Sequence, residues 1–162
     1  MQRSINLGKS DSHKFIADCH LGKLAKFLRL MGIDTLYFPH IEDDALLQLA
    51  KNEDRTILTR DRSLSERKNA PVFFLEPKET QAQLKLLIEF YKLQEHPLSF
   101  SRCIVCNTPL QMIEKEKVIE RLPEKVKKYF DYFEYCPTCD RIYWKGDHYR
   151  RMKRYLDQVL ES

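Results

Sequence analysis

The sequence contains little glycine and no long hydrophobic run. Only 4 of its 162 residues are glycine and 7 are proline, and no internal repeat is present, which excludes a fibrous or low-complexity chain. No stretch approaches the roughly 18 apolar residues that a membrane-spanning helix needs. The polar residues 1–4 lack the apolar segment of a signal peptide. We therefore expect a cytoplasmic protein without a membrane partner.

The composition is that of a globular protein with a weak excess of positive charge. Hydrophobic residues make up 43% of the chain and charged residues 32%, which is enough to form and solvate a core. The net charge is +4, because residues 1–100 contribute +1 and residues 101–162 contribute +3. This charge permits contact with nucleic acid without requiring it.

Between residues 14 and 93, short apolar runs alternate four times with helical patterns. Strands are expected at 15–17, 35–38, 56–59 and 72–75, and helices at 21–31, 43–50, 62–69 and 81–93. Asp43 is expected to cap the second helix. Apolar strands separated by helices indicate a parallel sheet with helices on both faces. We therefore predict an α/β domain over residues 14–97, preceded by a disordered segment at 1–13.

Four of the five cysteines form two Cys-x-x-Cys pairs, namely Cys103 with Cys106 and Cys136 with Cys139. Two such pairs can supply four thiolates to one tetrahedral Zn²⁺, whereas two redox dithiols would each need a helix after the first cysteine. Asn107 and Asp140 follow the pairs, and these residue types tolerate positive φ better than other non-glycine residues. We predict a structural zinc ribbon with a basic C-terminal helix over residues 98–162.

Three aspartates occupy similar places relative to the predicted strands. Asp18 ends the first strand, Asp43 begins the helix after the second, and Asp61 follows the third. These side chains can converge, because the carboxyl ends of parallel strands share one edge of the sheet. Converging carboxylates favour Mg²⁺ or Mn²⁺, which can support hydrolysis at phosphorus. The alternative is that each aspartate serves a local turn or cap, and Asp44 could replace Asp43.

Three segments, taken in this order, resemble the PIN-like ribonucleases: residues 18–32, 43–50 and 58–62. The double Cys-x-x-Cys, with residues 141–144 and 148–152, narrows the resemblance to the Mut-seven C-terminal RNase domain family, which joins a PIN-like domain to a zinc ribbon. The resemblance covers residues 14–160. It implies an Mg²⁺-dependent ribonuclease in which Asp18, Asp43 and Asp61 are catalytic. Mn²⁺ is the alternative catalytic metal. Many PIN-like domains carry a fourth acid where this chain has Ser63.

Cations and aromatic residues alternate near the end of the chain. Cations hold phosphates and aromatic rings stack on bases in proteins that bind single-stranded RNA. The predicted RNA-binding residues are Arg141, Lys145, Arg150, Arg151 and Arg154. The alternative for this segment is a solvated helix face.

The alternative for the whole chain is a nonenzymatic RNA-binding or adaptor protein that keeps the PIN-like fold. Ser63, at the position of a fourth acid, favours that alternative.

Overall fold

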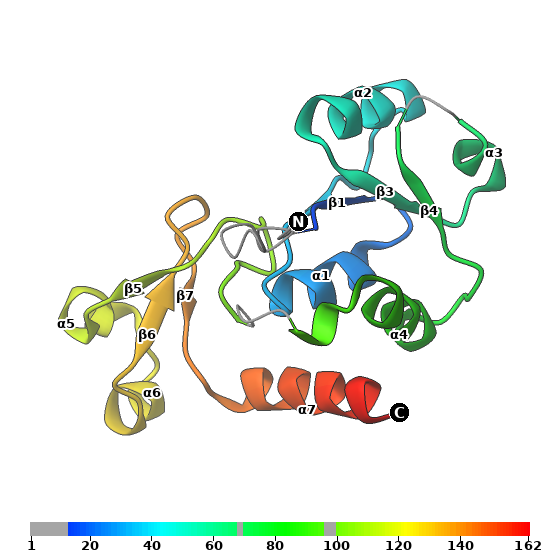
Figure 1. Cartoon of the computed structure of the whole chain (residues 1–162). Helices are drawn as coiled ribbons and strands as arrows, with labels where there is room; N and C mark the ends of the chain where they lie inside the picture. The colour runs from blue at the N-terminus through cyan, green and yellow to red at the C-terminus, as the bar shows by residue number, and fades with distance from the viewer. Residues whose placement is uncertain (1–12, 68–69, 96–99) are drawn as a thin grey trace, which may run out of the picture.

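The computed structural model describes residues 13–67, 70–95 and 100–162. It contains a parallel sheet in the N-terminal part, an antiparallel sheet in the C-terminal part, and a long C-terminal helix (Figure 1). Residues 1–12, which make up nearly all of the segment predicted to be disordered, lie outside the described residues. The predicted boundary at residues 97 and 98 also lies outside them.

The N-terminal sheet has four parallel strands in the order β2-β1-β3-β4. The strands are β1 (Phe15–Ala17), β2 (Thr35–Tyr37), β3 (Thr56–Thr59) and β4 (Val72–Phe74). Side chains alternate between the two faces of β1, so that Phe15 and Ala17 pack in one core and Ile16 packs in the other. The predicted α/β class is confirmed.

Helices cover both faces of this sheet. The helices are α1 (Gly22–Leu30), α2 (Asp43–Glu53), α3 (Arg62–Ser65) and α4 (Thr80–Tyr91), and a short 3₁₀ helix, Leu93–Glu95, follows α4. The larger core lies under α1 and α4, with Leu28 and Leu87 fully buried. The smaller core lies under α2 and α3, with Leu46 and Leu64 almost fully buried. With both faces of the sheet covered by helices, a pocket remains at the carboxyl ends of the strands.

The prediction that Asp43 caps α2 is wrong by one residue. Glu42 is the N-cap, with an extended backbone at φ −70° and ψ 147°, and Asp43 already belongs to the helix. Asp43 and Asp44 therefore lie in the first turn, where carboxylates interact favourably with the positive end of the helix dipole. This placement leaves the Asp43 side chain available to the edge of the sheet.

The C-terminal sheet is antiparallel and has the order β5-β6-β7. Its strands are β5 (Gln111–Ile113), β6 (Phe133–Tyr135) and β7 (Ile142–Tyr143), and its helices are α5 (Lys115–Val118), the 3₁₀ helix Ile119–Arg121 and α6 (Glu124–Tyr129). Val118, Leu122, Val126 and Phe133 form a small separate core. Together with a cluster of four cysteines, this arrangement confirms the predicted zinc-ribbon-like module.

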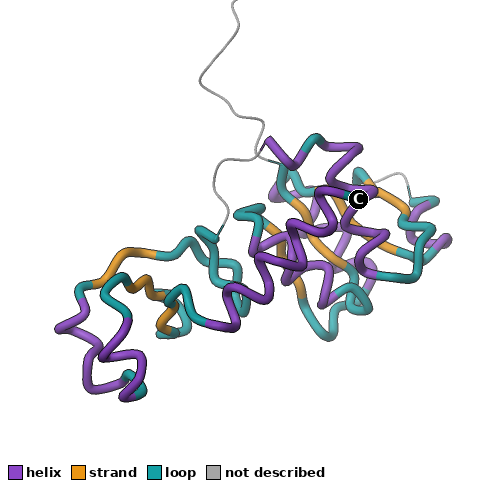
Figure 2. Tube along the Cα trace, turned by 90° about the horizontal axis from the view of Figure 1, so that it is seen from below, coloured by secondary structure: helices purple, strands orange, loops and turns teal. Residues whose placement is uncertain are grey.

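Helix α7 (Asp147–Glu161) follows the ribbon in the chain but packs on the N-terminal domain. Leu156 and Val159 are buried in the core under α1 and α4, and the ring of Tyr155 stacks on Phe27 of α1 with centroids 4.4 Å apart. Figure 2 shows α7 extending from the ribbon across the helices of the N-terminal domain. In the described part of the chain, no helix is long and apolar enough to cross a membrane.

Candidate functional site

The three predicted aspartates line one pocket at the carboxyl edge of the parallel sheet. This pocket, which we call the acidic pocket, has a volume of about 430 Å³. Asp18 enters it from the end of β1, Asp43 from the first turn of α2, and Asp61 from the loop after β3. Asp44 is not among the lining residues and instead lies 3.7 Å from Arg67. Of the two neighbouring acids, Asp43 is therefore the one that faces this pocket.

Thr59 links two of these aspartates. Its hydroxyl is fully buried and donates to Oδ2 of Asp18 at 2.7 Å, while it accepts a 3.0 Å hydrogen bond from the backbone N–H of Asp61. The other oxygen of Asp18 accepts from the backbone N–H of His20 at 3.0 Å. Asp18 is only 8% exposed, so these bonds fix the orientation of its carboxylate.

Asp61 is exposed and caps α3. Its Oδ1 accepts from the backbone N–H of Ser63 at 2.9 Å and from the Ser63 hydroxyl at 2.6 Å. The Ser63 hydroxyl, aided by the backbone amides of Leu64 and Ser63, holds the pKa of Asp61 below its ordinary value. Asp61 is therefore ionised at neutral pH. Ser63 thus bonds directly to Asp61 through both its backbone N–H and its hydroxyl.

The donor atoms of this pocket suit a hard cation, although they are not gathered as tightly as a closed metal site. Among the described residues, the group with ligand atoms within 4.8 Å of one another at this edge is Asp18, Cys19 and His20, without Asp43 or Asp61. Burial and a hydrogen bond with Asp18 raise the pKa of the Cys19 thiol. The carboxylate oxygens of Asp18, Asp43 and Asp61 are hard donors, and such donors favour Mg²⁺ or Mn²⁺.

The four cysteines of the ribbon form a second, compact cluster. Their sulfurs lie within 4.8 Å of one another, with 3.5 Å between Cys103 and Cys139 and 3.3 Å between Cys106 and Cys136. A tetrahedral Zn²⁺ with Zn–S bonds of about 2.3 Å places sulfurs about 3.8 Å apart, so the cluster suits one zinc ion. Burial opposes ionisation of Cys106, but hydrogen bonds with Thr108 and the neighbouring thiols lower its pKa to about 6. Burial, together with hydrogen bonds with Cys136 and Cys103, raises the pKa of Cys139 to about 12, so the four sulfurs become thiolates together only when they bind the metal.

The two cysteine turns have the same backbone geometry. The N–H of Asn107 donates to the carbonyl of Cys103 at 2.8 Å, and the N–H of Asp140 donates to the carbonyl of Cys136 at 2.9 Å. Both residues have positive φ, 75° at Asn107 and 60° at Asp140, as the sequence predicts. Neither residue is glycine, and both belong to the types that tolerate this conformation.

Sequence reasoning missed the contact between the first cysteine turn and the N-terminal domain. The buried guanidinium of Arg29 donates to the carbonyls of Ile104 and Val105 at 3.1 Å each, and to the carbonyl of Thr35 at 2.8 Å. Asn107 accepts from the Thr35 N–H at 2.9 Å and donates to Asp34 at 2.7 Å. The ribbon is thus bonded to the amino end of β2, opposite the edge that carries the acidic pocket.

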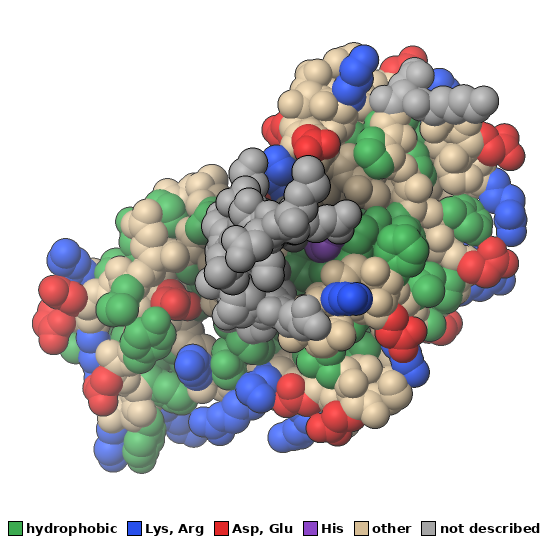
Figure 3. Space-filling view, viewed as in Figure 1, with side chains coloured by type: hydrophobic (Ala, Val, Ile, Leu, Met, Phe, Trp, Pro, Cys, Tyr) green, Lys and Arg blue, Asp and Glu red, His purple; other side chains and the backbone are tan. Residues whose placement is uncertain are grey.

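A larger pocket of about 770 Å³ lies between the ribbon and the start of α7. We call it the ribbon groove. Of the predicted RNA-binding residues, Arg141 and Lys145 line it, whereas Arg150, Arg151 and Arg154 are exposed on α7 outside it. Figure 3 shows Lys and Arg side chains along the lower edge of the molecule, where α7 lies. The structure therefore divides the predicted basic residues between a groove and an exposed helix face.

An α/β domain with aspartates at its carboxyl edge, followed by a four-cysteine ribbon, defines a class of two-part proteins with two distinct candidate metal centres. Comparison with protein families identifies the class: the Mut7-C RNAse domain matches residues 13–156. The chain belongs to the Mut7-C RNase domain family, which confirms the resemblance stated above and implies a ribonuclease. Searches of curated proteins and of solved structures returned no match.

Proposed function

We propose that the protein is a metal-dependent ribonuclease in which Asp18, Asp43 and Asp61 hold Mg²⁺ or Mn²⁺, and in which the ribbon and α7 contact single-stranded RNA. The observation that carries this proposal is the position of the three aspartates around one pocket, in a chain of an RNase family. Bound Mg²⁺ or Mn²⁺ supplies charge stabilisation at phosphorus and lowers the pKa of a coordinated water.

The chain's own residues perform the binding and orienting steps. Lys23, Arg60 and Lys78 also line the acidic pocket, so that three cations surround the three aspartates and can hold the phosphates on either side of the cleaved bond. Thr59 fixes Asp18 through a 2.7 Å hydrogen bond. A carboxylate that is already oriented does not lose rotational freedom when it binds its ligand, which favours catalysis.

The second candidate function is nonenzymatic RNA binding. It is favoured by Ser63, whose hydroxyl occupies the place of a fourth acid and bonds to Asp61 at 2.6 Å. Fewer carboxylates bind a divalent cation more weakly, so the protein could bind RNA without cutting it.

A cleavage assay with single- and double-stranded RNA decides between these functions. We expect Asp18→Asn, Asp43→Asn and Asp61→Asn each to abolish cleavage in Mg²⁺ or Mn²⁺, because the change keeps the shape of the side chain but removes its charge. Asp44→Asn is the matched control, since Asp44 lies next to Asp43 outside the pocket, and it should retain activity. Mn²⁺ should raise the Tm of the wild type and not that of Asp18→Asn. Cleavage that persists in excess chelator would exclude the metal mechanism.

A further inference from the structure

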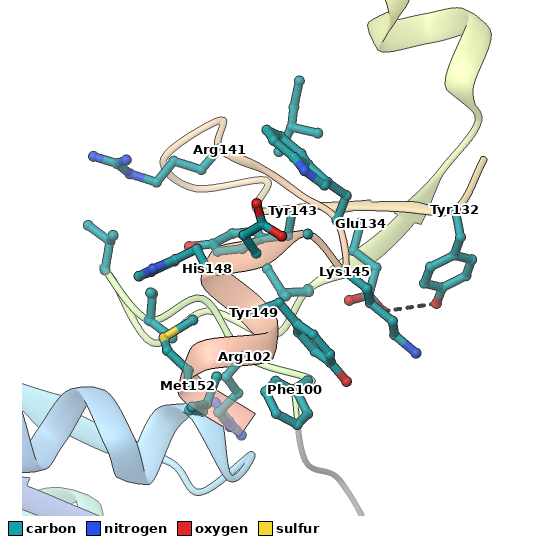
Figure 4. A pocket seen from close by; sticks show the side chains of 18 of the residues that line it. Phe100, Arg102, Tyr132, Glu134, Arg141, Tyr143, Lys145, His148, Tyr149 and Met152 are labelled. Atoms are coloured by element: carbon teal, nitrogen blue, oxygen red, sulfur yellow. Dashed lines mark hydrogen bonds between the residues drawn. The ribbon is translucent and has the colours of Figure 1, made fainter. Parts of the chain in front are cut away.

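The ribbon groove combines aromatic rings with cations, and two of these cations, Arg141 and Lys145, have no carboxylate partner among the described residues. Its lining includes the rings of Phe100, Tyr132, Tyr143, Trp144 and Tyr149. Gly146 makes room for one of them, because a Cβ at this position would lie 2.8 Å from the Trp144 indole nitrogen. Figure 4 shows Tyr132, Lys145 and Tyr149 on one side of the groove and Arg141 and His148 on the other. The groove thus presents flat apolar surfaces next to positive charge.

Lys145 lies between two of these rings. Its ammonium nitrogen is 5.8 Å from the ring centroid of Tyr132, on the ribbon, and 5.8 Å from that of Tyr149, on α7. Phe100 packs on Tyr149 with ring centroids 4.3 Å apart, which supports the Tyr149 ring from one side. Tyr132 remains 47% exposed. An aromatic ring with one supported face and a nearby cation is a platform on which a base can stack.

The groove is lined by four Lys or Arg side chains and by three carboxylates, so a small positive excess favours an anionic ligand. One of these carboxylates, Glu134, accepts a 3.0 Å hydrogen bond from the Tyr132 hydroxyl. Asp140 is paired with Arg121 at 3.1 Å, and Asp147 with Arg150 at 3.5 Å. Within the described residues, neither Arg141 nor Lys145 has a carboxylate within 4.0 Å, although both line the groove. These two cations are available to phosphates.

Helix α1 connects the groove to the acidic pocket. Its first turn contributes Lys23 to the acidic pocket, and its last residue, Leu30, lines the groove. Lys26 is exposed between them, and the spacing of three and four residues places Lys23, Lys26 and Leu30 on one face of the helix. Nine helical residues span about 14 Å, the length of about four stacked nucleotides at about 3.4 Å each.

We propose that the ribbon groove binds a nucleotide of single-stranded RNA at a distance of about four nucleotides from the acidic pocket, with the base on Tyr149 and Tyr132 and the phosphates on Lys145 and Arg141. Lys26 contacts the phosphates of the RNA between these two sites. This inference rests on the proposed function and specifies where the substrate strand lies outside the cleavage site. The groove acts as a clamp for unpaired bases and favours RNA long enough to reach it.

The test measures binding of a single-stranded RNA of about 12 nucleotides, carrying 2-aminopurine as a fluorescent base, to the zinc-loaded full chain with Asp18→Asn to prevent cleavage. We expect Tyr149→Leu and Tyr132→Leu each to weaken binding about tenfold and to reduce quenching of the 2-aminopurine. Lys145→Gln should flatten the log–log salt dependence by about 0.7. Tyr132→Leu is the safer aromatic variant, because Tyr132 is exposed, whereas Tyr149 packs on Phe100.

The ribbon offers matched controls outside the groove. Lys128 lies 5.3 Å from the ring centroid of Tyr129, and Tyr129 is 68% exposed. Tyr129→Leu and Lys128→Gln should therefore leave affinity and salt slope unchanged. A duplex of the same sequence should bind wild type and Tyr132→Leu equally, because its bases are not available for stacking. Equal effects of groove and control variants, or equal effects on duplex and single strand, would overturn the proposal.

The outcome also separates this inference from the proposed ribonuclease activity. If cleavage depends on the three aspartates while the groove variants bind like the controls, the groove inference is wrong and the ribonuclease proposal stands. If the groove variants lose affinity while the aspartate variants leave cleavage unchanged, the groove inference stands and the assignment of the acidic pocket is wrong.

Discussion

The carboxamide of Asn107 donates a 2.7 Å hydrogen bond to the carboxylate of Asp34, across the junction between the ribbon and the N-terminal domain. Asp34 also receives a 2.7 Å bond from Arg55 and lies 4.0 Å from Arg102. Asn107 directly follows the zinc-ligand candidate Cys106, so the cysteine turn and the sheet share one polar network.

Replacing Asn107 with glycine tests how much this junction contributes to the free energy of unfolding. Both Asn107→Gly and Asp140→Gly remove the cost of positive φ for a residue with a side chain, but only Asn107→Gly breaks bonds to the other domain. We expect Asn107→Gly to lower the free energy of unfolding by about 2 kcal/mol, because it leaves the Thr35 N–H and the Asp34 carboxylate without these partners. Urea denaturation should show a change near zero for Asp140→Gly, and equal values for the two variants would contradict the coupling.

Removal of the metal should affect both sides of the junction. We expect about one zinc per chain by elemental analysis, lost in Cys103→Ser. Removal of zinc should unfold mainly the ribbon, at about residues 100–146, because α7 is held by the core of the N-terminal domain. The structure adds that the Thr35 N–H, which donates to Asn107, should then exchange with solvent faster. The N–H of Ile57, which donates to Pro71 inside the sheet, is the internal control for hydrogen exchange and should stay protected.

The acid sensitivity of the fold should depend in part on Asp34. Burial raises the pKa of Asp34, but hydrogen bonds from Arg55 and Asn107 outweigh it and hold the pKa below its ordinary value. Such a carboxylate stabilises the fold above its unfolded-state pKa, near 3.9, and this contribution is lost as the pH falls through the lower folded-state pKa. Asp34→Asn should cost about 2 kcal/mol at neutral pH and should flatten the loss of stability as the pH falls below about 4.

An exposed carboxylate, that of Asp131, provides the comparison for Asp34. Asp131 lies 3.1 Å from Lys115, and its side chain is 94% exposed. Asp131→Asn should change the stability by less than about 0.5 kcal/mol at any pH, because solvent screens a carboxylate that is almost fully exposed. Equal pH profiles for Asp34→Asn and the wild type would show that the junction does not contribute to acid sensitivity.

Thr59 should matter for both stability and cleavage. Thr59→Val keeps the shape of this buried side chain but leaves Oδ2 of Asp18 and the N–H of Asp61 without their partner, which we expect to cost about 2 kcal/mol. We expect a rate about tenfold lower, because Asp18 is no longer held in one orientation. Thr59→Ser retains the hydroxyl and should be close to the wild type in both measurements. A Thr59→Val protein with full activity would remove Thr59 from the mechanism.

The exposed cations of α7 should contribute to RNA affinity without sequence preference. Replacing Arg150, Arg151 and Arg154 together with Gln should flatten the salt dependence of binding by about 2, at about 0.7 per phosphate contact. The triple variant of Lys125, Lys127 and Lys128 on α6 is matched to it, since each set contains one ion-paired member, Arg150 with Asp147 and Lys127 with Glu124. If the two triple variants have equal slopes, α7 does not contact RNA.

Local patterns predicted most of the N-terminal domain and of the cysteine turns. The four strands, and their alternation with helices, follow from apolar runs such as Phe15–Ala17. The positive φ of Asn107 follows from its place after a Cys-x-x-Cys pair. The position of Asp18 and Asp61 around one pocket follows from the rule that parallel strands end at a common edge. Each of these features depends on a few neighbouring residues or on a general rule of topology.

The features that the sequence did not predict depend on contacts between distant segments. Met152, Tyr155, Leu156 and Val159 have the spacing of an apolar helix face, which predicts that α7 is amphipathic, but nothing local indicates that its partners are α1 and α4. Arg29 and Asp34 look like ordinary surface residues in the sequence, whereas in the structure they bond to the ribbon more than 70 positions away. The Thr59 hydroxyl gains its role only when β1 and β3 are neighbours.

The return of α7 to the N-terminal domain limits how this protein can be rearranged by engineering. Leu156 and Val159 come after the ribbon in the chain yet complete the core beneath α1 and α4. A ribbon from another protein would therefore have to be joined both to the end of the N-terminal domain and to the start of α7. The second junction must also keep Leu156 and Val159 facing the core. A shortened chain that stops before α7 would expose the Phe27 face of α1 to water and favour aggregation. Exchange of the ribbon as a cassette is thus feasible only as an insertion between residue 100 and the native α7.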